Sequence, residues 1–168
     1  VKDFGAASPK EIEVSKLRVL SCLNFDDSTS ASYIPDTVFH SKYLYKLSSE
    51  EYSPGISISY DKQKFGDAKW FRCSGKFMYP NPPDYNTHVI VLDITGRNYW
   101  RGCLIENKID KKAERFSFDY FQTNKWSEIS YFLRIPGNLR DGDKINLFVW
   151  NVPRTELYMD DLCLELYK

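Results

Sequence analysis

The chain has 168 residues, a mass of 19.7 kDa and 23 basic against 23 acidic side chains. This length is typical of a single domain, which can bury a hydrophobic core without a metal ion or a disulfide. Neither end carries a basic or acidic tail, so nucleic acids and anionic membranes are not expected as partners. Apolar residues make up 42% and aromatic residues 16% of the chain, which predicts a folded, strand-rich protein. No apolar run approaches the roughly 18 residues of a membrane-spanning helix, so we expect no transmembrane segment.

Short apolar runs separated by turn residues begin at Leu17. We therefore expect residues 1–16 to form a leader or linker and residues 17–168 to form one domain. Alternating apolar and polar side chains, interrupted by turns such as Pro54-Gly55 and Asp141-Gly142, predict strands and no convincing helix. In chain order the expected strands cover residues 17–25, 38–47, 56–60, 70–79, 88–94, 99–109, 116–121, 127–135, 145–150 and 158–166. Many short strands at this spacing indicate an all-β sandwich or barrel.

The four cysteines, Cys22, Cys73, Cys103 and Cys163, are too far apart in the sequence for a zinc-binding pattern. The favoured interpretation is that they are buried, reduced thiols that pack as small apolar residues. The alternative is a disulfide such as Cys22–Cys163, which would join the first strand to the last one.

The sequence contains none of the common catalytic motifs. It has no glycine-rich phosphate-binding loop, no His-Glu-x-x-His and no Gly-x-Ser-x-Gly. Of the two histidines, His88 begins the most apolar strand and is expected to be a hydrogen-bonded structural residue, and His40 has no patterned partner. The strand motif that places paired carboxylates on one face of jelly-roll glucanases is also missing. We therefore predict a protein that is not an enzyme by itself.

The most specific pattern lies between residues 126 and 166. Three successive strands follow Trp126 there, and each has a characteristic end or beginning: Ile135-Pro136, Trp150-Asn151 and Tyr158-Met159-Asp160-Asp161-Leu162. This order resembles the C-terminal half of β-jelly-roll domains that are similar to carbohydrate-binding modules of the galactose-binding-like class. Near the start, Asn24-Phe25-Asp26 is similar to the Asn-x-Phe-Glu opening of the same domains.

The resemblance implies an antiparallel β-sandwich with jelly-roll topology. It further implies a noncatalytic, carbohydrate-binding accessory module of a secreted or cell-surface bacterial protein, with a glycan or oligosaccharide as its ligand. The alternative is the same sandwich used as a structural spacer, an adhesion domain or a protein-docking domain that binds no glycan. In either case, other domains of a larger surface protein are expected partners.

Because sugar rings stack on aromatic faces and sugar hydroxyls bind planar polar groups, the candidate ligand-binding residues combine these two types. They are Asn98, Tyr99, Trp100 and Arg101 at the start of one strand, together with Tyr79 and Tyr85 on either side of a proline-rich loop. Trp100 is open to a core or a surface role because its neighbours are polar. The other three tryptophans, Trp70, Trp126 and Trp150, are expected in the core.

The last strand places an acidic residue where apolar side chains are expected. By period two, Asp160 shares the core face with Leu162 and Leu164, and an unpaired carboxylate in a core is costly. The resemblance implies a structural calcium ion held by Asp160 and an acid of the first loop, Asp26 or Asp27, whose oxygens suit this cation. The alternative is that Asp160 accepts hydrogen bonds from backbone N–H groups without any metal.

Overall fold

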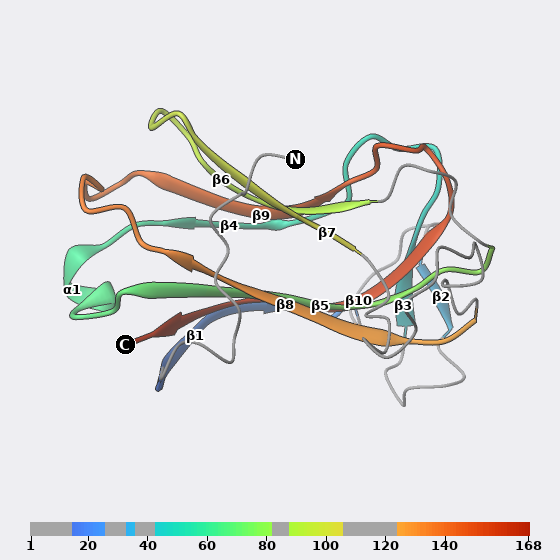
Figure 1. Ribbon diagram of the computed structural model, residues 1–168, viewed down its shortest axis with the longest axis horizontal. Helices are drawn as coiled ribbons and strands as arrows, with labels where there is room; N and C mark the ends of the chain where they lie inside the picture. Colours follow the sequence, from blue (N-terminus) through green and yellow to red (C-terminus); the bar gives the residue numbers. More distant parts are fainter. Residues whose placement is uncertain (1–14, 26–32, 36–42, 82–87, 106–123) are drawn as a thin grey trace, which may run out of the picture.

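The computed structural model describes residues 15–25, 33–35, 43–81, 88–105 and 124–168. Two antiparallel sheets lie face to face (Figure 1), so the chain is an all-β sandwich, as the sequence predicted. The elements in chain order are β1 (Lys16–Leu23), β2 (Tyr33–Pro35), β3 (Tyr43–Leu47), β4 (Ile56–Ser59), α1 (Lys62–Phe65), β5 (Trp70–Met78), β6 (Val89–Ile94), β7 (Tyr99–Leu104), β8 (Ser127–Arg134), β9 (Lys144–Trp150) and β10 (Leu157–Tyr167). Within these ranges no helix is long and apolar enough to cross a membrane.

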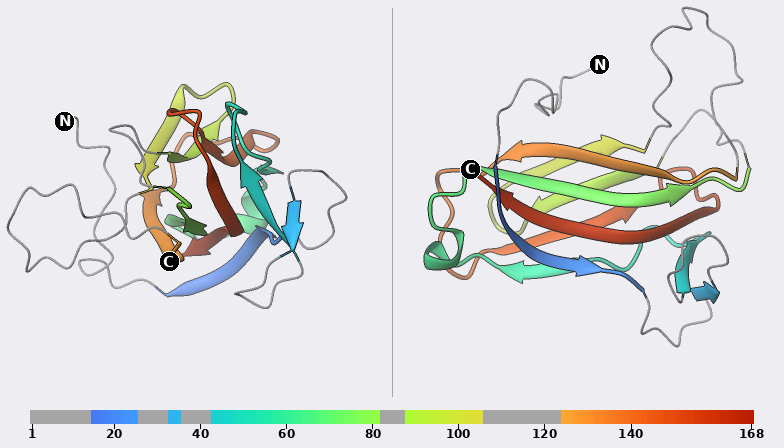
Figure 2. Two further views of the ribbon diagram at one scale, coloured as in Figure 1. Left: turned by 90° about the vertical axis from the view of Figure 1, so that its right-hand side faces the viewer. Right: turned by 90° about the horizontal axis from the view of Figure 1, so that it is seen from below.

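The first sheet has the strand order β2-β3-β10-β5-β8, with β1 also paired to β10. The 11-residue strand β10 holds two neighbours on one edge, since β3 pairs with residues 157–159 and β1 with residues 162–167. The second sheet has the order β4-β9-β6-β7. Most neighbouring strands are far apart in the sequence, as Figure 2 shows for β5, β8 and β10, so the topology is that of a jelly roll rather than a series of hairpins.

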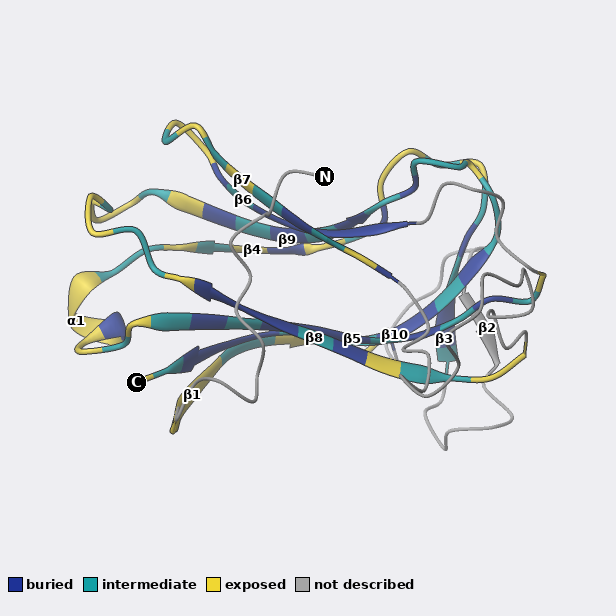
Figure 3. Cartoon of the chain, viewed as in Figure 1, coloured by how far each residue is buried: buried dark blue, intermediate teal, exposed yellow. Residues whose placement is uncertain are grey.

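Alternation along each strand sorts side chains between the core and the outer surface. In β9, Ile145, Leu147 and Val149 point between the sheets and are fully buried, whereas Phe148 and Trp150 lie on the outer face and are half-buried. Figure 3 shows this alternation as bands along the central strands. Each fully buried aliphatic side chain stabilises the fold by roughly 1.5–3 kcal/mol, so rows of this kind hold the two sheets together.

The domain boundary expected at residue 17 stays a prediction, because residues 1–14 lie outside the described part of the chain. Lys16, the last residue of the expected leader, already pairs with Tyr167 of β10. The strand expected at residues 116–121 also lies outside the described residues.

The uninterrupted alternation expected for the last strand is wrong. A bulge interrupts the β10–β5 ladder between Asp160 and Cys163, and Asp161 has a φ of 49° there. Before the bulge Met159 faces the core opposite Phe77, so Asp160, opposite Lys76, does not share the core face with Leu162 and Leu164 as expected. After the bulge the core positions shift by one residue, to Leu162, Leu164 and Leu166. Because a bulge inserts one extra residue, the period-two pattern changes phase at this point.

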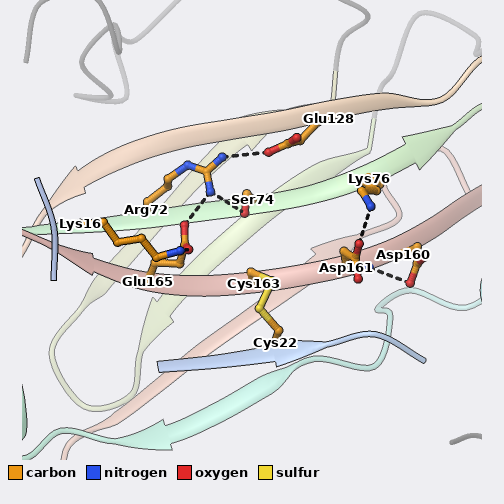
Figure 4. Close-up of a disulfide and its surroundings, with 10 residues drawn as sticks. All are labelled: Lys16, Cys22, Arg72, Ser74, Lys76, Glu128, Asp160, Asp161, Cys163 and Glu165. Atoms are coloured by element: carbon orange, nitrogen blue, oxygen red, sulfur yellow. Dashed lines mark hydrogen bonds and ion pairs between the residues drawn. A yellow bond between two sulfur atoms is a disulfide. The ribbon is translucent and has the colours of Figure 1, made fainter. Parts of the chain in front are cut away.

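The favoured interpretation of the cysteines is wrong for two of them. Cys22 and Cys163 lie opposite each other in the β1–β10 ladder and form a disulfide (Figure 4). Cys73 is a buried free thiol, as expected, and Cys103 is a free thiol with partial exposure. The sequence alone could not decide between these states, because the bridge joins residues 141 positions apart that meet only through strand pairing.

Candidate functional site

Four aromatic side chains gather on the outer face of the second sheet. Phe148 and Trp150 come from β9, Trp100 comes from β7, and Tyr52 comes from the segment before β4. Tyr52 makes an isolated bridge with Trp150. We call these four residues the aromatic stripe. Val91 of β6 lies beneath the stripe, opposite Phe148, and is fully buried although it faces outward.

At the β7 side of the stripe, a flat indole lies against the sheet. An atom added as Cβ at Gly102 would be 3.2 Å from the ring of Trp100 and 2.6 Å from Cγ1 of Val89. Because Gly102 has no side chain, the indole of Trp100 can pack closely against the backbone of β7. The ring centroids of Trp100 and Trp150 are 5.9 Å apart at an interplanar angle of 84°. Trp100 is 39% exposed, so its indole forms an aromatic surface in contact with solvent. The ring of Trp150 stands beside it at nearly a right angle.

At the β4 side, a second perpendicular pair borders an open hollow of about 390 Å³. The rings of Tyr52 and Phe148 are 5.4 Å apart at 88°, and Tyr52 is 52% exposed. Gly55 brings the backbone close to β9, because a Cβ there would lie 2.5 Å from the carbonyl oxygen of Leu147. The hollow is lined by Tyr52, Ser53, Gly55, Ile56, Ser57, Asn146, Leu147 and Phe148.

A row of polar side chains runs across the same face beside the stripe. The hydroxyl of Ser57 donates to Oδ1 of Asn146 at 2.8 Å. The amide Nδ2 of Asn146 donates to Oδ2 of Asp93 at 3.2 Å and to Oγ1 of Thr95 at 3.0 Å. Asp93 is the cross-strand partner of Trp100. The row thus places fixed amide, hydroxyl and carboxylate groups next to an exposed indole, which suits a ligand with one apolar face and several hydroxyls.

The structure separates the four neighbours that the sequence grouped as candidates. Trp100 lies in the stripe, but the adjacent residues Tyr99 and Arg101 point to the opposite face of β7, as alternation requires. Tyr99 packs against the core and donates its hydroxyl to the carbonyl oxygen of Arg134 at 3.2 Å, and burial raises its pKa. The guanidinium of Arg101 lies 4.8 Å from the centroid of the Tyr99 ring. Asn98 is in the preceding turn with a φ of 48°.

Tyr79 is removed from the candidates by its burial, since only 2% of it is exposed. Its hydroxyl lies 3.2 Å from the carbonyl oxygen of Ile105 and 3.1 Å from Nδ1 of His88. Nε2 of His88 lies 3.2 Å from the carbonyl oxygen of Thr155. His88 is fully buried, as the sequence predicted for a structural histidine, and burial lowers its pKa to about 4. Tyr85 lies outside the described residues.

Three members of the stripe were not among the expected ligand-binding residues. Trp150 was assigned to the core together with Trp70 and Trp126, but all three are half-buried. The signal that could have found Trp150 and Phe148 is the period-two pattern of β9, in which both alternate with buried aliphatic residues. Tyr52 has no such signal, because it lies in an irregular segment.

Asp160 is buried, with 2% of the residue exposed. Its Oδ1 accepts a hydrogen bond from the backbone N–H of Asp161 at 2.8 Å (Figure 4). In the ladder it lies opposite Lys76, whose ammonium is paired with Asp161 at 2.5 Å. This backbone hydrogen bond to Oδ1 is of the kind that the alternative without a metal predicts.

The described residues do not by themselves make a calcium site. No group of three or more His, Cys, Asp or Glu side chains that could hold a metal occurs within them. Asp26 and Asp27 lie outside them, so of the three expected ligands Asp160 alone is described. The calcium therefore stays a prediction.

The fold is similar to that of two solved carbohydrate-binding modules. The CBM22-1 xylan-binding domain of Xyn10C from Paenibacillus barcinonensis matches with a TM-score of 0.52 and 10% identity, over 89% of this chain and 94% of that one. The C-terminal family 22 carbohydrate-binding module of Xyn10B from Clostridium thermocellum matches with a TM-score of 0.50 and 14% identity, over 96% and 83%. No protein-family model and no curated protein sequence matches this chain. The chain therefore has a carbohydrate-binding-module-like β-sandwich fold with jelly-roll topology.

Proposed function

We propose that this chain is a noncatalytic module that binds a polysaccharide on the outer face of the β4-β9-β6-β7 sheet. The observation that carries the proposal is the aromatic stripe beside the row Ser57, Asn146, Asp93 and Thr95. A pyranose ring has apolar C–H faces and a polar rim, so it can stack on an indole while its hydroxyls bind fixed amide and carboxylate groups.

The lack of charged side chains in the hollow favours a neutral glycan. None of the side chains that line the hollow is ionisable apart from the phenol of Tyr52. Asp93 supplies one carboxylate in the polar row, and Oδ2 of this carboxylate already accepts from Asn146. One of the structurally similar domains is described as xylan-binding, so xylan is the first polysaccharide to test.

The lining of the hollow also supports binding without catalysis. Hydrolysis of glycosides ordinarily needs two carboxyl groups on either side of the scissile bond. The residues lining the hollow contribute no carboxyl group. A module that binds a polysaccharide without cleaving it needs only a complementary surface.

The Cys22–Cys163 disulfide supports a secreted or cell-surface location, and the proposed bacterial source rests on the resemblance of residues 126–166 alone. Disulfides persist in oxidising compartments such as the periplasm and the cell exterior. Polysaccharides of biomass and cell walls are found in the same surroundings, so the location and the ligand class fit each other.

A second candidate function is docking to another protein domain. Leu104 of β7 is 47% exposed and faces outward with Trp100 on the same strand. Exposed apolar side chains that extend an aromatic surface are typical of protein interfaces. In that case the stripe would be covered by a neighbouring domain of a larger surface protein and would bind no sugar.

An array of immobilised polysaccharides, including xylan, cellulose and mixed-linkage glucan, tests the proposal with the purified chain. We expect saturable binding to at least one neutral polysaccharide. Binding to none of them at high protein concentration would contradict the proposed function and leave docking as the better explanation of the stripe.

The proposed calcium is tested separately by thermal unfolding in the presence of EDTA. A bound structural calcium predicts a lower melting temperature for the wild-type chain in EDTA and no such effect for Asp160→Asn. An unchanged melting temperature of the wild-type chain would contradict a bound structural calcium.

A further inference from the structure

The position of Tyr52 depends on an irregular segment rather than on a strand. Residues 48–55 connect β3 of the first sheet to β4 of the second, and we call this segment the arm. Among the described residues of the arm, Tyr52 alone pairs with a strand, through its isolated bridge with Trp150. Whether Tyr52 stays perpendicular to Phe148 therefore depends on the contacts that hold the arm.

A buried asparagine directly after β9 holds the arm from behind. Asn151 is fully buried. Its Nδ2 donates to the carbonyl oxygen of Ser48 at 2.6 Å, and its backbone N–H donates to the carbonyl oxygen of Glu51 at 2.8 Å. Its Oδ1 accepts from the backbone N–H of Thr155 at 3.2 Å. One residue thus links two points of the arm to the turn that precedes β10.

The arm has two further sets of contacts, one of them exposed and the other next to Tyr52. The guanidinium of Arg154 donates to the carbonyl oxygen of Ser49 at 3.2 Å and to Oε2 of Glu51 at 2.8 Å, but its side chain is 50% exposed. Ser53 exchanges hydrogen bonds with Val149 at 2.9 Å in both directions. An exposed ion pair contributes little, whereas leaving buried hydrogen-bonding groups unpaired is costly. Asn151 is therefore the buried side chain that holds the part of the arm before Tyr52, and Ser53 holds the part after it.

We propose that Asn151 is a positioning residue that holds Tyr52 in place at the edge of the hollow and so sets the affinity for glycan without touching it. The inference rests on the proposed function and goes one step further. Binding is tighter when the contacting groups are already ordered in the free protein, because ordering them on binding costs conformational entropy. If the arm were mobile in the free protein, glycan binding would have to order it, and the entropy cost would weaken the affinity.

Asn151→Asp tests this role because it keeps the size and one oxygen acceptor but removes the amide donor to Ser48. With a soluble xylo-oligosaccharide as the titrant, or the polysaccharide that the array identifies, we expect the dissociation constant to rise about 10-fold. Should this variant fail to fold, Asn151→Ser removes the same donor without adding a charge and is measured in the same way. Affinity equal to that of the wild-type chain would overturn the inference.

A double-mutant cycle with Tyr52→Ala separates positioning from general destabilisation. If Asn151 acts through Tyr52, the double variant binds no more weakly than Tyr52→Ala alone. Fully additive losses would mean that Asn151 acts elsewhere and would contradict the inference. Ile129→Val, in the core side of β8, is the matched control: it lowers the melting temperature and leaves the affinity unchanged.

Hydrogen exchange of backbone amides tests the role of Asn151 in the free protein, without any glycan, and so separately from the proposed function. In Asn151→Asp the backbone amides of Ser53 and of residue 151, which donate to Val149 and Glu51 in the wild-type chain, are expected to exchange faster, while those of β5 do not change. A wild-type chain that binds no glycan would defeat the proposed function, and exchange would still report whether Asn151 orders the arm. Unchanged exchange in the arm would defeat the inference even if glycan binds.

Discussion

The two outer faces of the sandwich differ in what their polar groups are bound to. On the first sheet, Arg72 of β5 pairs with Glu165 of β10 at 2.6 Å and with Glu128 of β8 at 2.9 Å, and Lys16 of β1 also pairs with Glu165 (Figure 4). We call these four residues the charged row. Glu165 is 4% exposed. Burial pushes its pKa upward, but the hydrogen bonds from Lys16 and Arg72 outweigh burial and leave the pKa below its usual value.

On the second sheet, the outer face presents aromatic rings and a polar row that can still accept a ligand. Oδ1 of Asp93 takes no part in the hydrogen bonds of the described residues, and Trp100 and Tyr52 are the most exposed rings of the stripe. Both faces follow the same alternation of side chains. The comparison shows that an outer face of a β-sandwich can bind a ligand only where some of its outward side chains are not already paired with one another.

The largest expected effect comes from the disulfide on the charged face. Replacing both Cys22 and Cys163 by serine should lower the free energy of unfolding by about 4 kcal/mol, because the bridge closes a long loop in the unfolded chain. Urea unfolding measures this loss. Since the disulfide lies on the opposite face from the stripe, glycan affinity should not change, and a parallel loss of affinity would show that the two faces are not independent.

The next effect comes from breaking the charged row. Arg72→Met leaves Glu165 buried with one cationic partner fewer and should lower the free energy of unfolding by about 3 kcal/mol. Arg134→Met, an exposed residue at the end of β8, is the control and should cost less than about 0.5 kcal/mol. Equal losses in the two variants would contradict the idea that this face is held together by internal ion pairs.

A buried histidine behind the arm makes the fold sensitive to acid. The pKa of His88 is about 4 in the folded chain and about 6.5 in the unfolded chain. As the pH falls from 6.5 to 4, the unfolded chain takes up the proton first, so stability should fall by up to about 3 kcal/mol. His88→Gln should lose this part of the pH dependence in urea unfolding measured across that range. Identical pH profiles of the variant and the wild-type chain would contradict it.

The clearest effect on binding is expected from the exposed indole. Trp100→Ala should weaken glycan binding by about 30-fold, which corresponds to about 2 kcal/mol for a stacked aromatic residue. Trp70→Ala is the matched control, because Trp70 is a half-buried tryptophan on the outer face of the first sheet. Isothermal titration calorimetry measures both. A larger loss for Trp70→Ala would move the binding face to the other sheet.

A smaller effect is expected from the glycine beneath that indole. In Gly102→Ala the new methyl group would lie 2.6 Å from Cγ1 of Val89 and 3.2 Å from the ring of Trp100. The side chain of Val89 must shift and the indole must move by a few tenths of an ångström, so affinity should fall by about 3-fold to 10-fold, or roughly 1 kcal/mol. In the turn before β7, Gly96→Asn is a suitable control, because nothing lies within 4 Å of an added Cβ there and asparagine tolerates its φ of 81°. Equal affinity of Gly102→Ala and the wild-type chain would mean that glycan binding does not depend on the close packing of the indole against Gly102.

The strands and the core could be predicted from the sequence because alternation is a local property. In β9 the pattern of Ile145, Leu147 and Val149 identifies the buried face without any knowledge of the partner strands. The same alternation could have separated Trp100 from Tyr99 and Arg101, since neighbours on a strand point to opposite faces.

Long-range features could not be predicted in this way. Nothing local distinguishes the outer face of one sheet from that of the other, so the pairing of Cys22 with Cys163 and the docking of Tyr52 beside Phe148 appear only once the strands are placed. The bulge at Asp161, by contrast, could have been noticed in the sequence, because the apolar positions change phase between Leu157 and Met159 on one side and Leu162 and Leu164 on the other.

The most direct test is a chemical-shift titration of the ¹⁵N-labelled chain with the glycan that binds best in the array. If the stripe binds glycan, the indole N–H signals of Trp100 and Trp150 and the amides of β7, β9 and the arm shift together and saturate. Shifts confined to Trp70, Arg72 and their neighbours on the first sheet would contradict binding at the stripe.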